Sequence, residues 1–198
     1  MKEIILSLVI LTGAGASFSF KNHNHSSVFI CNYSGHATNY SGRIDLQKPA
    51  SVAVQRVHSI VNTVGLKQNF SIHSANVGNA SALVNGSSRY ILYNPRFMEQ
   101  VRNAAGVDWT SYAILAHEVG HHLNGHTIQR GGSNPSIELE ADEFSGFVLA
   151  KMGASLPDAQ AAMKLIASPR TSKTHPARHL RLSAIEKGWR KGRGQIAS

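Results

Sequence analysis

Apolar residues recur at helical spacing in several separate parts of this chain. Residues 50–64 have this periodicity, and a further helix opens at Leu156-Pro157-Asp158 and runs through Ile166. Pro176 is expected to open a last helix, whose apolar side carries Leu180, Leu182 and Ile185. The pattern therefore predicts a chain in which helices dominate.

A helix is also predicted in the middle of the chain. Residues 111–116 contain helix formers and no proline. Asn124-Gly125 interrupts the pattern. The apolar face consists of Ile114, Leu115, Val119 and Leu123.

A second central helix follows a glycine-rich loop at residues 131–135. Asn134 has the residue type of a helix cap, and Pro135 suits the first turn. We expect this helix to run from about Ser136 toward Gly153.

The clearest strand signal lies ahead of the central helices. Tyr90 to Tyr93 is a short β-rich run that Asn94-Pro95 ends, and Asn85-Gly86 is a hairpin-turn signal. A β-hairpin is therefore predicted immediately before the first central helix.

The segment from Ala116 to His122 carries the candidate chemistry. It reads Ala-His-Glu-Val-Gly-His-His, with His117 and His121 four residues apart and Glu118 between them. On a helix, positions i and i+4 share a face, so both imidazoles can bind one metal ion. Glu118 is rotated by about 100° from His117. It is therefore expected beside the metal, in reach of a water there, as a general base.

A catalytic zinc site needs a third protein ligand and an open position. Glu138 is the candidate, and Asp142, four residues later on the same helix face, can accept a hydrogen bond from the outer nitrogen of a ligand histidine. Glu140 lies about 200° from Glu138 around the axis. We expect Glu140 and Glu143 to be solvent-facing charges. A surface position for Glu138 is the alternative.

The motifs Leu115-Ala116-His117-Glu118-Val119-Gly120-His121-His122, Glu138-Leu139-Glu140-Ala141-Asp142 and Thr174-His175-Pro176 with Arg181 resemble those of the zinc metallopeptidases that include HtpX and the CaaX prenyl proteases. The resemblance covers about residues 50 to 190. It implies an α+β, zincin-like fold, mostly helical with a small β-sheet beside the active-site helix. It also implies gluzincin coordination of one catalytic Zn²⁺ by His117, His121 and Glu138. Those membrane-embedded relatives have transmembrane helices, whereas the mature chain expected here has no apolar run of that length.

The resemblance extends to a substrate-binding edge and to the C-terminal motif. The hairpin would present residues Asn79, Ala80, Ser81, Ala82 and Leu83 as an exposed strand edge for an extended peptide. Two ordinary strands without a substrate role are the alternative. His175 corresponds to a histidine near the cleft and could hydrogen-bond the oxyanion. A helix cap is the competing interpretation. Arg181 is expected to pair with an acidic group near the site.

The other histidines are not expected to bind the metal. His122 and His126 are rotated away from the metal face, and His58, His73 and His179 have no partner at ligand spacing. We expect ordinary polar or packed side chains at these five positions. His23, His25 and His36 lie in an Asn- and Ser-rich stretch that is typical of solvated disorder, with loose metal binding as the alternative.

The N-terminal end of the chain predicts export. Lys2 precedes the apolar segment Ile4 to Leu11, and Ala14-Gly15-Ala16 has the small residues that a signal peptidase recognises. Cleavage after Ala16 would give a periplasmic or secreted protein. The predicted organisation is a signal peptide at 1–16, a flexible polar leader at 17–45, a peptidase domain at 46–190 and a frayed basic tail at 191–198. Cys31, the single cysteine, cannot form an internal disulfide.

Composition adds a weak indication of partners. The chain has 198 residues, 42% of them hydrophobic, and a net charge of +9. This size suits one domain with a hydrophobic core. The basic balance favours weak association with an anionic envelope surface or acidic substrates. Nucleic acid fits poorly, because an exported chain without a recognition motif rarely meets it.

The sequence as a whole predicts a zinc metalloendopeptidase that hydrolyses an extended or unfolded polypeptide substrate, with Glu118 as general base. Two alternatives remain open. One is a non-proteolytic module in which zinc braces a domain that binds an envelope partner. The other is a peptidoglycan amide or peptide hydrolase. The oligomeric state and the natural substrate do not follow from the residues.

Overall fold

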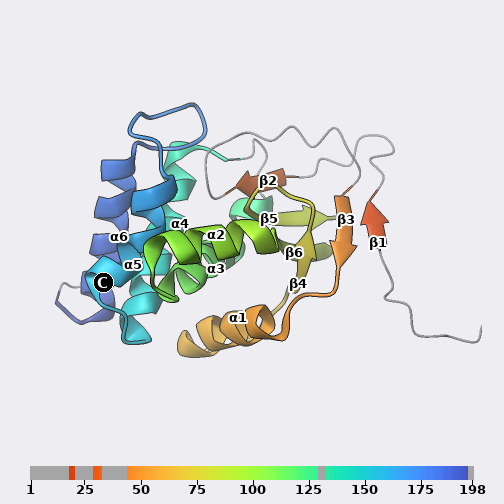
Figure 1. Cartoon of the computed structure of the whole chain (residues 1–198), viewed down its shortest axis with the longest axis horizontal. Helices are drawn as coiled ribbons and strands as arrows, with labels where there is room; N and C mark the ends of the chain where they lie inside the picture. The colour runs from red at the N-terminus through yellow and green to blue at the C-terminus, as the bar shows by residue number, and fades with distance from the viewer. Residues whose placement is uncertain (1–17, 21–28, 33–43, 129–132, 196–198) are drawn as a thin grey trace, which may run out of the picture.

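The computed structural model describes residues 18–20, 29–32, 44–128 and 133–195, which form an α+β fold. The sheet lies at one end of the molecule and α4, α5 and α6 at the other, with α2 and α3 between them (Figure 1). The expected signal peptide, residues 1–16, lies outside the described residues.

The sheet has six strands in the order β1-β3-β4-β6-β5-β2. Strands β4 and β6 run parallel, and every other neighbouring pair is antiparallel. The predicted hairpin is confirmed as β5 and β6, with Gly86 at a φ of 60° in the turn. The strands are β1 (Phe18–Phe20), β2 (Phe29–Asn32), β3 (Ile44–Gln47), β4 (Ser71–Ala75), β5 (Ala80–Asn85) and β6 (Ser88–Tyr93).

The flexible leader predicted at residues 17–45 is wrong for the part of it that the structure describes. Residues 18–20 pair with β3, and residues 29–32 pair with β5. Both pairs are antiparallel, so main-chain hydrogen bonds hold these short segments on the sheet. These two segments have no alternating apolar pattern strong enough to indicate strands.

The helices follow the apolar periodicity closely. The predicted helices at 50–64 and 156–166 are α1 and α5, and the two central helices are α3 and α4. No helix within the described ranges is long and apolar enough to cross a membrane. The helices are α1 (Ser51–Thr63), α2 (Pro95–Ala105), α3 (Trp109–Leu123), η1 (His126–Ile128), α4 (Pro135–Lys151), α5 (Leu156–Ile166) and α6 (Arg178–Gly192).

Helix α2 was not predicted, although its start has a recognisable signal. The side chain of Asn94 accepts hydrogen bonds from the backbone N–H groups of Arg96 and Phe97, and Pro95 occupies the first turn. Asn94-Pro95 therefore ends strand β6 and caps α2 at the same time.

Helix α3 runs through the core and is almost entirely buried. Ile114, Leu115, Ala116 and Val119 have 0% exposure and pack among side chains from the sheet and from the surrounding helices. Full burial of an isoleucine, leucine or valine side chain stabilises a fold by about 1.5–3 kcal/mol. The core thus fixes the helix that carries the candidate motif.

Helices α4 and α6 pack with their backbones in close contact, because glycines line the interface. A Cβ atom on Gly188 would overlap the carbonyl group of Glu143, and one on Gly146 would overlap that of Ile185. This packing places the first turns of α6 beside α4. It also brings Arg181 into the interior, where its side chain is 1% exposed.

Two expectations for the C-terminal part are wrong. Leu180 is 41% exposed, and Arg181 takes the buried position beside Ile185. The frayed tail was predicted at 191–198, but its first two residues belong to the end of α6. Lys187 and Lys191 each lie 2.7 Å from a carboxylate oxygen of Glu143. These ion pairs and the glycine interface keep the basic segment helical.

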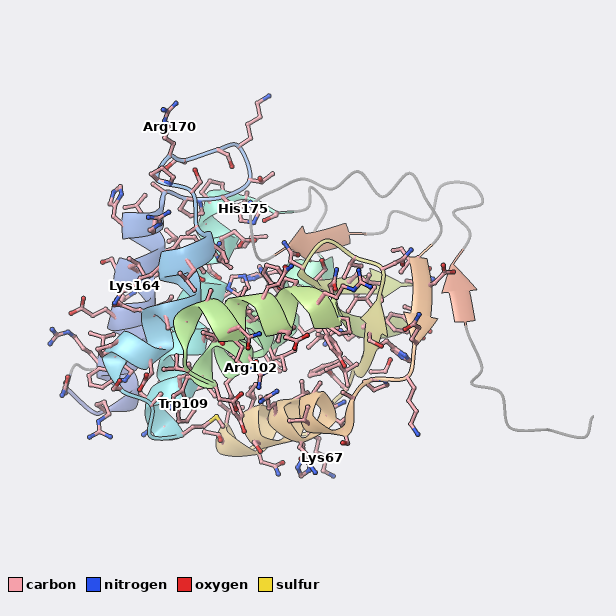
Figure 2. The ribbon with its side chains drawn as sticks, viewed as in Figure 1. Lys67, Arg102, Trp109, Lys164, Arg170 and His175 are labelled. Atoms are coloured by element: carbon pink, nitrogen blue, oxygen red, sulfur yellow. The ribbon has the colours of Figure 1, made fainter. Side chains whose placement is uncertain are left out.

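Basic side chains project from the helical end of the molecule. Lys164 on α5 and Arg170 in the segment before α6 both lie at the surface (Figure 2). Their positions agree with the concentration of basic residues after Lys151 in the sequence.

Candidate metal centre

The centre lies where helices α3 and α4 pack together. His117 and His121 come from successive turns of α3, and Glu138 comes from the first turn of α4. Gly120, between the two histidines, permits the close approach, because a Cβ there would lie 3.3 Å from the Cα of Ala141. Ser145 on α4 also donates a 3.0 Å hydrogen bond to the carbonyl of Ala113 on α3.

The start of α4 determines where Glu138 lies. The side chain of Asn134 accepts hydrogen bonds from the N–H groups of Ser136 and Ile137, and Pro135 occupies the first turn. The predicted cap is thereby confirmed. Because α4 begins at this point, its fourth residue faces the histidines of α3.

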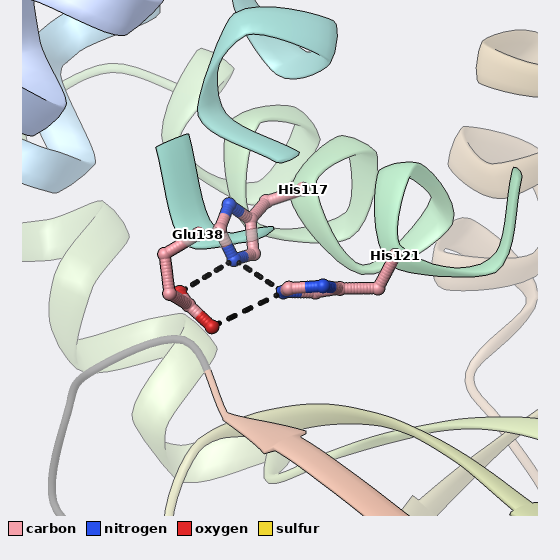
Figure 3. A group of neighbouring side chains, drawn as sticks. All are labelled: His117, His121 and Glu138. Carbon is pink, nitrogen blue, oxygen red and sulfur yellow. Dashed lines mark hydrogen bonds and ion pairs between the residues drawn. The ribbon is translucent and has the colours of Figure 1, made fainter. Parts of the chain in front are cut away.

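Three potential ligand residues converge (Figure 3). The Nε2 atoms of His117 and His121 lie 3.0 Å apart. Oε2 of Glu138 lies 3.3 Å from Nε2 of His117, and Oε1 lies 3.4 Å from Nε2 of His121. Ligands about 2.0–2.1 Å from a tetrahedral zinc ion are separated by about 3.3–3.4 Å. The donor set and its spacing therefore suit a metal ion.

All three side chains are completely buried, with 0% exposure. Strands β5 and β2 pass close to α3 beside them (Figure 3). The three candidate ligands therefore lie inside the fold and not at its surface.

Asp142 orients His117. Its Oδ1 lies 2.9 Å from Nδ1 of His117, so the ring nitrogen donates and Nε2 faces the other ligands. Arg181 donates to both oxygens of Asp142, from Nε at 2.7 Å and from Nη2 at 2.9 Å. The structure thus brings both predicted supporting residues, one from α4 and one from α6, to the same side of the centre.

His121 has a partner that the sequence interpretation missed. Its Nδ1 lies 3.0 Å from Nδ1 of His126, and Nε2 of His126 lies 3.0 Å from Oε2 of Glu140. Glu140 is 57% exposed, as predicted, and His126 is packed, but the contact of His126 with a ligand histidine was not predicted. A helix-wheel argument places His126 far from the metal face, but α3 ends at Leu123 and the chain turns at Gly125, where φ is 74°.

Glu138 is held by further contacts. Ser133 Oγ donates a hydrogen bond to Oε1, which the sequence interpretation also missed. Nη2 of Arg181 and Nε2 of His175 each lie 3.4 Å from Oε2. The alternative of a surface position for Glu138 is thus excluded by its burial.

His175 lies beside the ligands and not at the start of α6. Its side chain is 8% exposed, and Nδ1 lies 2.9 Å from Oγ1 of Thr174. Helix α6 is capped at Ala177, so the helix-cap interpretation of His175 is wrong.

Glu118 is buried near the ligands and interacts electrostatically with His117 and Glu138. The residue has 0% exposure, and within the described structure neither carboxylate oxygen makes a hydrogen bond. Burial raises its pKa to about 8, against the opposing effect of His117. The backbone amide of Ala82 in β5 also acts to lower this pKa, without reaching hydrogen-bond geometry. A carboxyl group of this kind exchanges a proton near neutral pH.

The ligands have unequal proton affinities. Burial lowers the pKa of His117, but Asp142 and Glu138 outweigh it and raise the value to about 9. Burial lowers the pKa of His121 to about 4 despite Glu138. Burial also opposes ionisation of Glu138, yet the two histidines hold its pKa well below the usual range. Without a metal, His117 therefore carries the proton and His121 is neutral.

The exposed substrate edge predicted at residues 79–83 is wrong as placed. Strand β5 has neighbours on both sides, β6 and β2, and Cys31 of β2 pairs with Ala82. The segment is also buried, at 3% for Asn79 and 0% for Ser81. A peptide could pair with β5 only after β2 had left it.

His122 is packed, as expected for a histidine off the metal face. Its ring stacks on Phe70 with centroids 5.1 Å apart, and Nε2 lies 2.9 Å from the carbonyl of Tyr90. His58 contacts Asn62 on the exposed side of α1. His23, His25 and His36 lie outside the described residues.

Comparison with known proteins gives no further assignment: neither protein-family models, nor curated proteins, nor solved structures contain a match to this chain.

Proposed function

We propose that this chain is a zinc-dependent metalloendopeptidase with a zincin-like domain, of the type that includes HtpX and the CaaX prenyl proteases. The observation that carries the proposal is the convergence of His117, His121 and Glu138 at tetrahedral ligand spacing, with the buried Glu118 next to them. Three protein ligands leave a fourth position open, which is typical of a catalytic site and not of a structural one.

A bound zinc ion would supply Lewis-acid activation of the attacking water and of the scissile carbonyl. Glu118 would take a proton from that water and transfer it to the leaving amine, so the peptide bond is exchanged for a new carboxylate and a free amine. In the metal-free fold the pKa of Glu118 is about 8, so this carboxyl group can lose or gain a proton near neutral pH.

The residues around the ligands have separate tasks in this proposal. Asp142 and Arg181 keep His117 in the orientation that presents Nε2. His175 reaches the same space from the segment before α6, and its Nε2 can donate to the oxyanion of the tetrahedral intermediate.

The proposed substrate is an extended or unfolded polypeptide of the envelope or the exterior. The N-terminal signal at residues 1–16 supports export, and the basic surface supports weak association with an anionic envelope. N-terminal sequencing of the protein from the producing cell tests export, since cleavage after Ala16 would leave Ser17 first.

The experiment that tests peptidase activity is cleavage of an unfolded, fluorescently quenched protein. We expect cleavage that a chelator abolishes and stoichiometric zinc restores. His117→Ala should lose both zinc and cleavage, whereas the control Glu99→Gln, an exposed carboxylate on α2, should retain both. Cleavage that survives complete removal of the metal would overturn the proposal.

Complete burial of the ligands supports a second candidate, a domain that zinc only braces for binding an envelope partner. That candidate predicts tight zinc, no cleavage of any unfolded protein and binding to envelope fractions. Digestion of purified murein in the same assay separates a peptidoglycan hydrolase from both.

A further inference from the structure

His126 links a metal ligand to the protein surface. Its ring lies between His121 and Glu140, with nitrogen–nitrogen and nitrogen–oxygen distances that are both 3.0 Å. The side chain of His126 is 1% exposed, whereas that of Glu140 is 57% exposed. A continuous path of hydrogen bonds therefore runs from the metal centre to solvent.

The chemistry of the partners fixes the direction of each hydrogen bond. An ionised carboxylate can only accept, so Nε2 of His126 donates to Glu140. A neutral His126 then has a lone pair on Nδ1, and Nδ1 of His121 must donate to it. His121 is left with its lone pair on Nε2, the atom that faces His117 and Glu138.

The opposite direction conflicts with metal binding. If Nδ1 of His126 donated, neutral His121 would carry its proton on Nε2. That proton would occupy the position between the ligands that a metal ion needs. Ionised Glu140 thus favours the one tautomer of His121 that can bind the ion.

The two ligand histidines are therefore supported differently. His117 contacts Asp142 directly, and Asp142 is 1% exposed and neutralised by Arg181. His121 reaches a carboxylate only through a second imidazole, and that carboxylate lies in solvent. The local fold explains why His126 lies between His121 and Glu140, because the turn at Gly125 brings η1 back onto the end of α3.

We propose that His126 and Glu140 are positioning residues that hold His121 as the Nδ1–H tautomer and so set the affinity of the centre for its metal. The inference rests on the metal-binding part of the proposed function and is independent of peptide cleavage. Neither residue touches the metal, and each acts on it through His121.

The test measures zinc affinity and imidazole tautomers on the full mature chain. Zinc affinity is obtained by competition with a chromophoric chelator. Long-range ¹⁵N–¹H spectra of the zinc-loaded chain report which ring nitrogens carry protons. The variants are His126→Ala, His126→Gln and Glu140→Gln. The control is Glu143→Gln, which removes another carboxylate of α4 whose partners are lysines of α6.

We expect His121 with a proton on Nδ1 and His126 with a proton on Nε2. Zinc affinity should fall at least about tenfold in His126→Ala. It should fall less in Glu140→Gln, by about threefold, because this acceptor is partly screened by solvent. His126→Gln should recover part of the loss, since its amide oxygen can accept from His121, and Glu143→Gln should bind as the wild type does.

Two results would overturn the inference. One is a proton on Nδ1 of His126 in the zinc-loaded chain. The other is unchanged zinc affinity in both Glu140→Gln and His126→Ala, of which the first alters only an exposed side chain. Absence of zinc binding by the wild-type chain would instead contradict the proposed function itself, so the two failures are distinguishable.

Discussion

Asp142 and His117 form a buried pair in which Oδ1 lies 2.9 Å from Nδ1, while Arg181 neutralises the carboxylate from α6. This arrangement couples metal binding to helix packing, because His117, Asp142 and Arg181 come from three different helices. The same carboxylate orients a ligand and provides the counter-charge of a buried guanidinium.

Asp142→Ala is therefore expected to damage both properties. Zinc affinity should fall about 10- to 100-fold, because His117 loses the group that orients it. The free energy of unfolding should fall by about 3 kcal/mol, because Arg181 keeps its charge in a buried position. Chelator competition and denaturant unfolding measure the two effects. The exposed Asp108→Asn is the control, and an Asp142→Ala chain with wild-type stability would show that the pairing is unimportant.

Glu118 makes the metal-free protein less stable as the pH rises. Its pKa is about 8 in the fold against an ordinary value of 4.5, so the folded state binds more protons than the unfolded state between these values. Stability therefore falls as the pH rises through this window. Glu118→Gln removes the effect: we expect no gain near pH 4.5 and a gain of about 2–4 kcal/mol near pH 8.5. Urea unfolding at both pH values checks this, and equal stability of the two chains at pH 8.5 would contradict it.

Zinc binding is expected to be strongly pH-dependent. The pKa of His117 is about 9, and the imidazole must lose its proton before Nε2 can bind the ion. Between pH 6 and 8, the apparent association constant should rise by about tenfold per pH unit. Asp142→Asn should flatten this dependence, because it removes the charge that raises the pKa of His117. Calorimetry in buffers of different ionisation enthalpy counts the released protons, and no release at pH 7 would be inconsistent with this assignment.

The glycine interface between α4 and α6 predicts a stability effect far from the metal. In Gly188→Ala, the new methyl group would overlap the carbonyl of Glu143, and the two helices would have to separate. We expect a loss of about 1–3 kcal/mol in the free energy of unfolding. Ser183→Ala, at an exposed position of the same helix, is the matched control. If Gly188→Ala proved as stable as Ser183→Ala, the close packing of the two backbones would be wrong.

Local signals in the sequence predicted much of the helical part. Helix α5 has the predicted bounds, and Asn134 caps α4 as its residue type indicates. These features depend on neighbours within one turn of helix, so a single sequence contains the necessary information. The spacing of His117, Glu118 and His121 also depends only on neighbours within about one turn of helix.

Features that depend on distant segments were missed. Strand β2 covers β5 although about fifty residues separate their partners Cys31 and Ala82. Arg181 is buried on α6, whereas Leu180, which was expected to be buried, is exposed. The apolar periodicity did not predict this, because the ion pair between Arg181 and Asp142 joins two different helices. His126 contacts His121 only because a turn intervenes, and helical geometry cannot predict a contact beyond the end of the helix.

The most direct test of the central claim is the cleavage rate of Glu118→Gln at full zinc occupancy. One zinc ion per chain is first verified by elemental analysis for the wild type and the variant. The account predicts the same zinc content and a loss of about 10²- to 10⁴-fold in kcat/KM on a quenched unfolded substrate. Wild-type cleavage by the zinc-loaded variant would contradict the assignment of Glu118 as the general base.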